Sequence, residues 1–167
     1  MTRLVAVAAV FGLSLGSLPC VACAETVPPD FALRAEAGPR LPGKSVRRIE
    51  VTGTTATLAV VMPEGRATGS GTVTGTVTLT PAALACLYGA VTAAGSLTAT
   101  SPAANGMLDG TYVTLAVTAG GVTTPLVANN QAFAPIDDVV RRLNGLVPAD
   151  AQLKYNEIIG SAAVACP

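Results

Sequence analysis

The sequence predicts an α+β domain in which an antiparallel sheet of about six strands carries two helices on one face. Six short stretches alternate between apolar and polar side chains, which is the period of a β-strand. Two other stretches repeat apolar residues at helical spacing, and each begins at a proline. The order of four strands, helix, two strands and helix favours a single antiparallel sheet with both helices on one side. A small β-sandwich with helical connections is the alternative that these patterns leave open.

Residues that favour turns separate the first four strands. Gly38-Pro39 is expected to end the first strand, Gly53 to form the tight turn after the second, and Pro63-Glu64-Gly65 to end the third. In the fourth strand, a row of threonines is expected to face water and the valines to face the core. An ice-binding or glycan-binding ladder would need several such rows, and we find one. The strands are expected at residues 31–37, 46–52, 55–62 and 72–79.

Threonine and proline mark the start of the first helix. Thr80 is a good N-cap, and Pro81 suits the first helical position. Gly95 is expected to end the helix, since glycine adopts the backbone conformation that closes a helix C-terminus. The apolar stripe of this helix is expected to comprise Leu84, Leu87, Tyr88 and Val91.

A hairpin is expected next, after a turn at Asp109-Gly110. Its strands at 112–118 and 122–128 are joined by Ala119-Gly120-Gly121. Pro125 has no backbone N–H to donate, so the second strand is expected at a sheet edge or at a bulge.

The second helix is expected to begin at Pro135 and to end before Pro148. Residues 151–159 are expected to form a short helix, and residues 162–166 an extended tail. The apolar stripe of the second helix is expected to comprise Ile136, Val139, Val140, Leu143 and Val147.

The first 24 residues have the features of a secretory signal peptide. Arg3 provides a positive charge, an apolar run follows, and Ala22-Cys23-Ala24 forms a small-residue cleavage site. The run is shorter than the roughly 20 apolar residues that a membrane span needs. We therefore expect a signal peptide at 1–24, an extended leader at 25–30 and a single domain at 31–167, secreted or in a bacterial periplasm.

The spacing Cys20-x-x-Cys23 lies inside this predicted signal peptide. A redox dithiol would stand in a βαβ unit, and no such pattern follows. Lipidation of Cys23 is the alternative, although Cys20 stands where a lipobox usually has leucine. We prefer an ordinary signal peptide, whose removal takes both cysteines with it.

Two cysteines remain in the mature chain, Cys86 and Cys166. In an oxidising compartment, such a pair predicts a disulfide. At 100° per residue, Cys86 lies about 160–200° from the apolar stripe of its helix. It therefore faces away from the sheet, where the C-terminal tail can reach it. Two free thiols are the alternative.

The composition excludes several classes of function. The chain has no histidine and no tryptophan, its aromatic content is 4%, and its formal net charge is zero. Without histidine there is no imidazole base, no Ser-His or Cys-His pair and no histidine metal ligand. Few aromatics and a balanced charge are not typical of nucleic-acid binders. We expect no cofactor, no metal site and no transmembrane segment in the mature chain.

No catalytic constellation is visible in the sequence. Asp137-Asp138 is the one adjacent acidic pair, and its position four residues before Arg141-Arg142 is explained by helix electrostatics. Lys44 beside Ser45 lacks the S-x-x-K spacing of a serine–lysine dyad. We therefore assign no catalytic residue and expect a protein that is not an enzyme. Two distant carboxylates acting on a glycan would leave no local motif, so this alternative stays open.

Basic residues concentrate in the first part of the mature chain, where six of nine fall between positions 34 and 66. On paired strands they would form a positive patch for an acidic partner or an anionic surface. A solvated strand face interspersed with Glu36, Glu50 and Glu64 is the alternative, which we favour. Loops at 38–45, 63–71 and 96–110 are further candidates for partner contacts. The basic residues are Arg34, Arg40, Lys44, Arg47, Arg48 and Arg66.

The layout from about residue 72 to residue 147 resembles a known family. The stretches "TVTLTPAALACLYGAVTAAG", "DGTYVTLAVTAGGVTTPLVA" and "APIDDVVRRLNGLVP" are similar to emfourin-type bacterial inhibitors of thermolysin-like metalloproteases and to related secreted domains of unknown function. Family members tend to carry more charge in the second hairpin strand than Val122-Thr123-Thr124-Pro125, so we assign no inhibitory residue. The resemblance implies a small non-catalytic binder.

Together, these observations predict a secreted or periplasmic, non-enzymatic domain that binds a protein. An extracellular protease is the candidate partner that the resemblance implies. A structural or lipid-anchored cell-envelope protein is the alternative.

Overall fold

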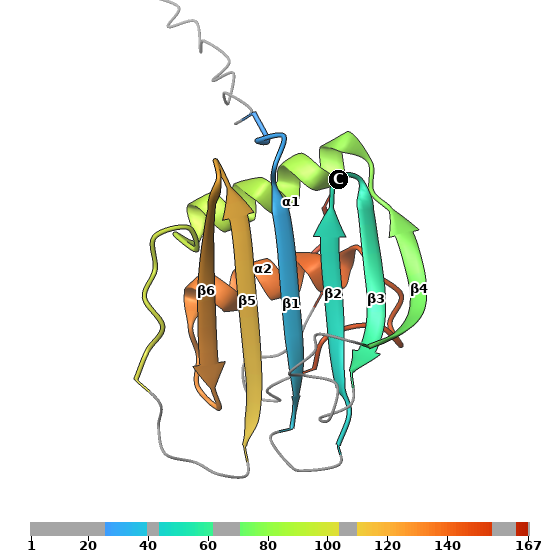
Figure 1. Ribbon diagram of the computed structural model, residues 1–167, viewed down its shortest axis with the longest axis vertical. Coiled ribbons are helices and arrows are strands. Elements are labelled where there is room, and N and C mark those ends of the chain that lie inside the picture. The colour runs from blue at the N-terminus through green and yellow to red at the C-terminus, as the bar shows by residue number, and fades with distance from the viewer. Residues whose placement is uncertain (1–25, 40–43, 62–70, 104–109, 155–162, 167) are drawn as a thin grey trace, which may run out of the picture.

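A computed structural model describes residues 26–39, 44–61, 71–103, 110–154 and 163–166. Over these residues the chain forms a six-stranded antiparallel sheet in the order β4-β3-β2-β1-β5-β6, and both helices lie behind one face (Figure 1). The predicted α+β class and ββββαββα order are confirmed, and the sandwich alternative is not formed. The elements are β1 (Ala32–Pro39), β2 (Val46–Thr52), β3 (Thr55–Val61), β4 (Thr72–Thr78), α1 (Pro81–Ala93), β5 (Thr111–Ala119), β6 (Val122–Asn129) and α2 (Ala134–Gly145).

Strand β1 lies in the middle of the sheet and pairs with β2 and β5. The predicted end of this strand at Gly38-Pro39 is wrong, because both residues continue β1 opposite Tyr112 and Thr111. Pro39 is the last residue of the strand, where a missing N–H disturbs the ladder least. Gly38 is required here, since a Cβ at this position would come within 2.6 Å of the Val46 side chain.

Strand β4 departs from the predicted alternation. Leu58 of β3 is opposite Gly75, but Ala59 is opposite Val73, so Thr74 is an extra residue in β4. Such a β-bulge interrupts the two-residue period of the side chains. The prediction that the valines of this strand face the core is therefore wrong for Val73, which is 59% exposed.

Helix α1 begins and ends as its sequence predicts. The Thr80 hydroxyl accepts a hydrogen bond from the Ala83 N–H at 3.0 Å. At the other end, Gly95 adopts a φ of +70°, and the Ser96 N–H donates to the Val91 carbonyl at 3.0 Å. These are the bonds of a helix closed at both ends.

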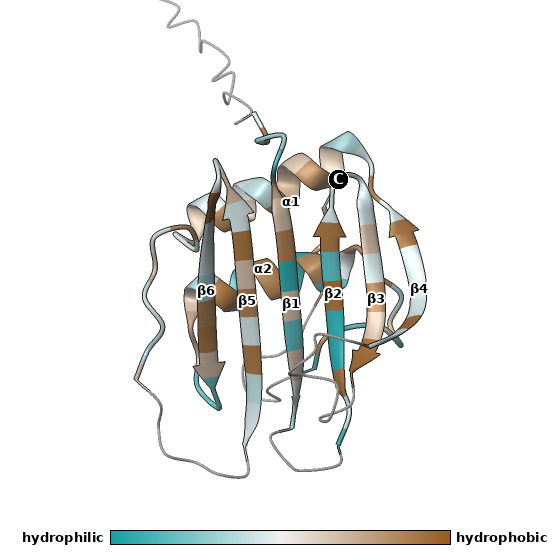
Figure 2. Ribbon diagram, in the orientation of Figure 1, coloured by the Kyte–Doolittle hydropathy of each residue, from teal (hydrophilic) through white to brown (hydrophobic). Residues whose placement is uncertain are grey.

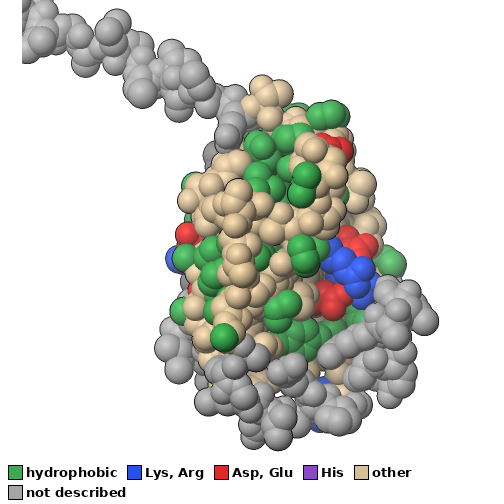
Figure 3. Space-filling model, turned by 60° about the vertical axis from the view of Figure 1, so that its left-hand side comes forward, with side chains coloured by type: hydrophobic (Ala, Val, Ile, Leu, Met, Phe, Trp, Pro, Cys, Tyr) green, Lys and Arg blue, Asp and Glu red, His purple; other side chains and the backbone are tan. Residues whose placement is uncertain are grey.

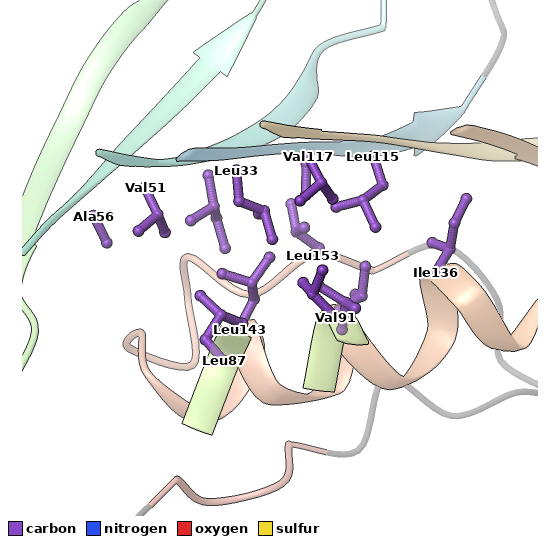
Figure 4. Packing of buried hydrophobic residues seen from close by; sticks show 14 of the residues in the cluster. Leu33, Val51, Ala56, Leu87, Val91, Leu115, Val117, Ile136, Leu143 and Leu153 are labelled. Atoms are coloured by element: carbon purple, nitrogen blue, oxygen red, sulfur yellow. The ribbon is translucent and has the colours of Figure 1, made fainter. Parts of the chain in front are cut away.

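The core lies between the sheet and the two helices. Figure 4 shows Leu33 and Leu115 pointing from the sheet toward the helix layer, from which Leu87, Val91 and Leu143 point back into the same cluster. The predicted stripe residues of the second helix are all buried, although Val147 lies just beyond the end of α2 at Gly145. In α1, Ala83 is buried and Leu84 is only half-buried. Burial of one aliphatic side chain stabilises a fold by about 1.5–3 kcal/mol, so this layer is the main source of stability.

The chain after α2 is held by hydrogen bonds to its backbone. The Asn144 side chain donates to the Leu153 carbonyl at 2.9 Å and accepts from the Leu153 N–H at 2.8 Å. Arg47 of β2 donates to the Gln152 carbonyl at 2.8 Å, and Leu153 is fully buried. The short helix predicted at 151–159 is therefore not formed over residues 151–154, and residues 155–159 lie outside the described residues.

Cys86 of α1 and Cys166 form the predicted disulfide, with their Cα atoms 5.8 Å apart. The tail before Cys166 contacts α2, since the Val164 N–H donates to the Arg141 carbonyl at 2.9 Å. The disulfide joins positions 80 residues apart and ties the C-terminal segment to the helix layer.

Asp30, just before β1, is hydrogen-bonded to the turn that joins β5 and β6. The Asp30 carboxylate accepts hydrogen bonds from the N–H groups of Gly120 (3.0 Å) and Gly121 (2.6 Å) in the β5–β6 turn. Residues 29 and 30 form a turn, so the predicted leader is not extended throughout. The predicted signal peptide lies outside the described residues.

Candidate binding surface

The sheet face opposite the helices is uncovered by any helix or strand of the described chain (Figure 1). We call it the open face. Most of its side chains are threonine, alanine and valine, and charged residues lie at its centre on β1 and β2, where Figure 2 shows hydrophilic bands. The register assigns to it Val73, Thr76 and Thr78 of β4, Thr55, Thr57, Ala59 and Val61 of β3, Val46, Arg48, Glu50 and Thr52 of β2, Ala32, Arg34 and Glu36 of β1, Tyr112, Thr114, Ala116 and Thr118 of β5, and Thr123, Pro125, Val127 and Asn129 of β6. At one end of this face Val46, Val61 and Tyr112 are buried and form a small apolar cluster of their own.

Four charged residues form an ion-pair network at the centre of the open face. The register sets Arg34 opposite Glu50 and Glu36 opposite Arg48. One Glu36 oxygen, Oε1, lies 2.6 Å from Arg34 Nη2 and 2.6 Å from Arg48 Nε. The second carboxylate, Glu50, is more distant, at 3.5 Å from Arg34 Nε and 3.6 Å from Arg48 Nη1. Two positive and two negative side chains thus balance each other.

The members of the network differ sharply in exposure. The side chains of Arg48 and Glu36 are 5% and 10% exposed, whereas those of Arg34 and Glu50 are 43% and 40% exposed. The inner pair therefore stabilises the network, and the outer pair presents one positive and one negative group to solvent.

The pKa of Glu36 reflects its place in the network. Burial would by itself raise the pKa of this carboxyl group, because it disfavours the charged form. The hydrogen bonds and positive charges of Arg34 and Arg48 outweigh burial and hold the pKa of Glu36 below its usual value. Glu36 is therefore ionised at neutral pH.

Two shallow hollows flank Arg34 on the open face. One, of about 230 Å³, is lined on its open side by Ala32, Glu50, Thr52 and Thr118. The other, of about 330 Å³, is lined by Glu36, Thr114, Pro125 and Val127. Arg34 and Ala116 border both hollows. Figure 3 shows the charged cluster beside apolar and neutral polar side chains, without a deep cleft in this view.

The basic residues that the sequence singled out do not share one surface. Arg47 lies opposite Ala37, on the helix-bearing face, and there it holds the Gln152 carbonyl. Binding of a partner by these residues stays a prediction. Arg34 and Arg48 lie on the open face, Arg47 on the other face, Lys44 is exposed before β2, and Arg40 and Arg66 lie outside the described residues.

The ion-pair network has a signal in the sequence. Arg34-x-Glu36 and Arg48-x-Glu50 have the same order, so antiparallel pairing in this register sets each arginine opposite a glutamate. The interspersed acidic residues indicated a balanced face, but only the register shows that these four residues meet.

The remaining residues that the sequence singled out lie away from the ion-pair network or outside the described residues. Asp137 Oδ2 accepts a hydrogen bond from the Phe133 N–H at 2.8 Å, across the first turn of α2. Lys44 and Ser45 are both exposed. Asp109 and most of the predicted contact loops lie outside the described residues. Within the described ranges, no three His, Cys, Asp or Glu side chains gather as a metal site would require.

Comparison with protein-family models and with curated protein sequences finds no match for this chain. Neither described helix is long and apolar enough to cross a membrane.

Proposed function

We propose that this chain is an exported, non-enzymatic domain that binds a protein through the open face. The observation that carries the proposal is a sheet face that no described helix or strand covers, with paired charges at its centre. Glu36 holds Arg34 through hydrogen bonds to its guanidinium, so the face presents this positive charge with little loss of side-chain freedom on binding. Glu50 lies within ion-pair distance of both arginines. A rigid scaffold with a preorganised surface is typical of a binding domain.

Export is supported by the disulfide and by the predicted signal peptide. Disulfides persist in oxidising compartments such as the periplasm and the extracellular space. The partner that we propose is an extracellular protease, on the strength of the resemblance to emfourin-type inhibitors. Short side chains around Arg34 leave room for a protruding segment of such a partner in the two hollows.

An inhibition screen with the mature chain tests the proposal. The chain from Glu25 is titrated at nanomolar concentrations against panels of metalloproteases and serine proteases. We expect dose-dependent inhibition of at least one enzyme. If the chain inhibits no enzyme in either panel, the proposed inhibitor function is wrong.

A matched pair of variants tests the surface. Ala116 borders both hollows, so Ala116→Gln should fill them and weaken inhibition at least about tenfold, the equivalent of 1.4 kcal/mol. Ala82 is exposed on α1, in the helix layer, so Ala82→Gln should leave inhibition unchanged. Equal inhibition by the two variants would show that the open face is not the binding surface.

A further inference from the structure

The two edge strands of the sheet, β6 and β4, differ in what lies beside their outer backbone groups. At the β6 edge, Pro125 has no N–H to offer, and the Val127 N–H donates to the Ser101 hydroxyl at 2.9 Å. The Thr124 hydroxyl donates to the Leu97 carbonyl at 2.9 Å, so the segment after α1 runs beside β6 (Figure 1). This edge is closed to a further strand.

At the β4 edge, no described strand lies beyond β4. Strand β4 is the last in the order and pairs with β3 alone among the described strands. Its seven residues read T-V-T-G-T-V-T, all of them are exposed or half-buried, and none is charged or a proline. Natural edge strands usually carry a lysine, a proline, a β-bulge or a covering segment, because exposed backbone groups recruit further strands. At this edge the described residues show a single such device, the bulge at Thr74.

The register shows which backbone groups of β4 face outward. The Leu79 N–H donates to the Thr54 carbonyl at 2.7 Å. Hydrogen-bonded and non-hydrogen-bonded pairs alternate along an antiparallel ladder. Val77 and Gly75 therefore direct their backbone groups toward β3, whereas Thr76 and Thr78 direct theirs toward the outer edge of the sheet.

We propose that β4 is a self-association edge, at which two copies of this chain pair antiparallel about a two-fold axis at Thr76. Thr76 then exchanges hydrogen bonds with Thr76 of the second copy, and Thr78 lies opposite Thr74. The two six-stranded sheets become one continuous sheet. The bulge confines the pairing to the part of β4 that begins at Thr74.

The sequence of β4 fits a second copy of itself. Since the strand has no charge, two copies oppose no like charges, which is the usual obstacle to self-pairing. Across the axis each Val77 lies opposite a Gly75, which has no side chain to oppose it. A Cβ at Gly75 would meet only Leu58 Cδ1, at 3.6 Å, so this position has room.

A hollow beside this strand gives independent support. On the helix-bearing side, about 330 Å³ of open space adjoins Gly75 and Val77 and is lined further by Arg47, Pro148 and Asp150. The second copy's strand would cover this hollow with its own Val77. The pairing is short, so its buried area falls below the roughly 1,600 Å² of a standard interface, and we expect a weak, reversible dimer. The dimer does not depend on the proposed function.

Analytical ultracentrifugation of the mature chain tests the pairing. We expect the weight-average mass to rise from monomer toward dimer between about 1 μM and 1 mM, the range of a weak dimer. Thr76→Lys and Thr76→Glu should each weaken association at least tenfold, because each sets like charges opposite one another at the axis. An equal mixture of the two variants should restore association, since opposite charges then meet.

The matched control is Thr123→Lys, which changes an exposed threonine of the closed edge and should leave association unchanged. Restoration by mixing also shows that the two Thr76 variants are folded. A wild-type chain that stays monomeric over the whole range would overturn the proposal. So would a dimer that Thr76→Lys leaves intact, or variants that fail to associate when mixed.

Discussion

Removal of the Glu36 carboxylate tests how the open face is held together. Glu36→Gln keeps the shape of the side chain but removes the negative charge that two arginines share. Loss of one member of a buried ion pair typically costs 3–5 kcal/mol. Arg34 is 43% exposed and loses little, whereas Arg48 is 5% exposed and loses a close partner. Since glutamine keeps one acceptor and Glu50 remains 3.6 Å from Arg48, we expect a loss of about 2–3 kcal/mol.

Urea unfolding at several pH values measures this loss. The pKa of Glu36 is lowered in the folded chain, so the stabilisation is present above the ordinary glutamate pKa of about 4.3 and is lost as the pH falls through the folded-state pKa. The difference between wild type and Glu36→Gln should therefore be full at pH 7 and shrink in acid. Glu50→Gln, at a side chain that is 40% exposed, should cost less than about 1 kcal/mol. A Glu36→Gln chain within about 0.5 kcal/mol of wild type at pH 7 would refute this reasoning.

Three further predictions concern the ends of the chain. Cys86→Ser with Cys166→Ser should lower the free energy of unfolding by up to about 4.5 kcal/mol, the chain-entropy value for a loop of this length, as urea titration will show, and an unchanged midpoint would contradict it. Gly145→Ala adds a Cβ that overlaps the Val164 carbonyl, so it should cost about 1–3 kcal/mol in the same assay, and a neutral result would mean that the tail does not pack on α2. An NMR titration should find the pKa of Asp30 below its ordinary value, because the N–H groups of Gly121 and Gly120 favour the charged form, and Asp30→Asn should abolish the corresponding acid-induced shift of both glycine amides.

Features set by neighbouring residues were predictable from the sequence. The capping threonine Thr80, the closing glycine Gly95 and the Gly120-Gly121 turn each act within a few residues, so the local pattern is sufficient. The stripe of α2 from Ile136 to Leu143 was predictable because one helical period fixes these positions, whereas Val147, also expected in the stripe, lies beyond the helix end. Pro125 predicted an edge strand correctly, since a missing donor excludes the middle of a sheet.

Features set by distant residues were not predictable in the same way. The bulge at Thr74 depends on the register between β3 and β4, and the alternating pattern of β4 conceals it. Asn144 holds Leu153 through two hydrogen bonds to its backbone, and no helix or strand period signals such a contact. The continuation of β1 through Pro39 depends on β5, which lies far along the chain.

The candidate surface was predictable in its residues but not in its arrangement. The sequence identified a concentration of arginines and the interspersed glutamates. Two strands with the same Arg-x-Glu order form a neutral network only if they pair antiparallel in this register. Arg47 was expected with the other arginines, but the alternation of β2 places it on the helix-bearing face.

Intact-mass spectrometry of the chain recovered from the producing cells, with and without reductant, tests the account most directly. We expect a mature product that begins at Glu25 and gains the mass of two hydrogen atoms on reduction, as export and a Cys86–Cys166 disulfide require. A full-length chain in the cytosol, with both cysteines alkylated under native conditions, would contradict it.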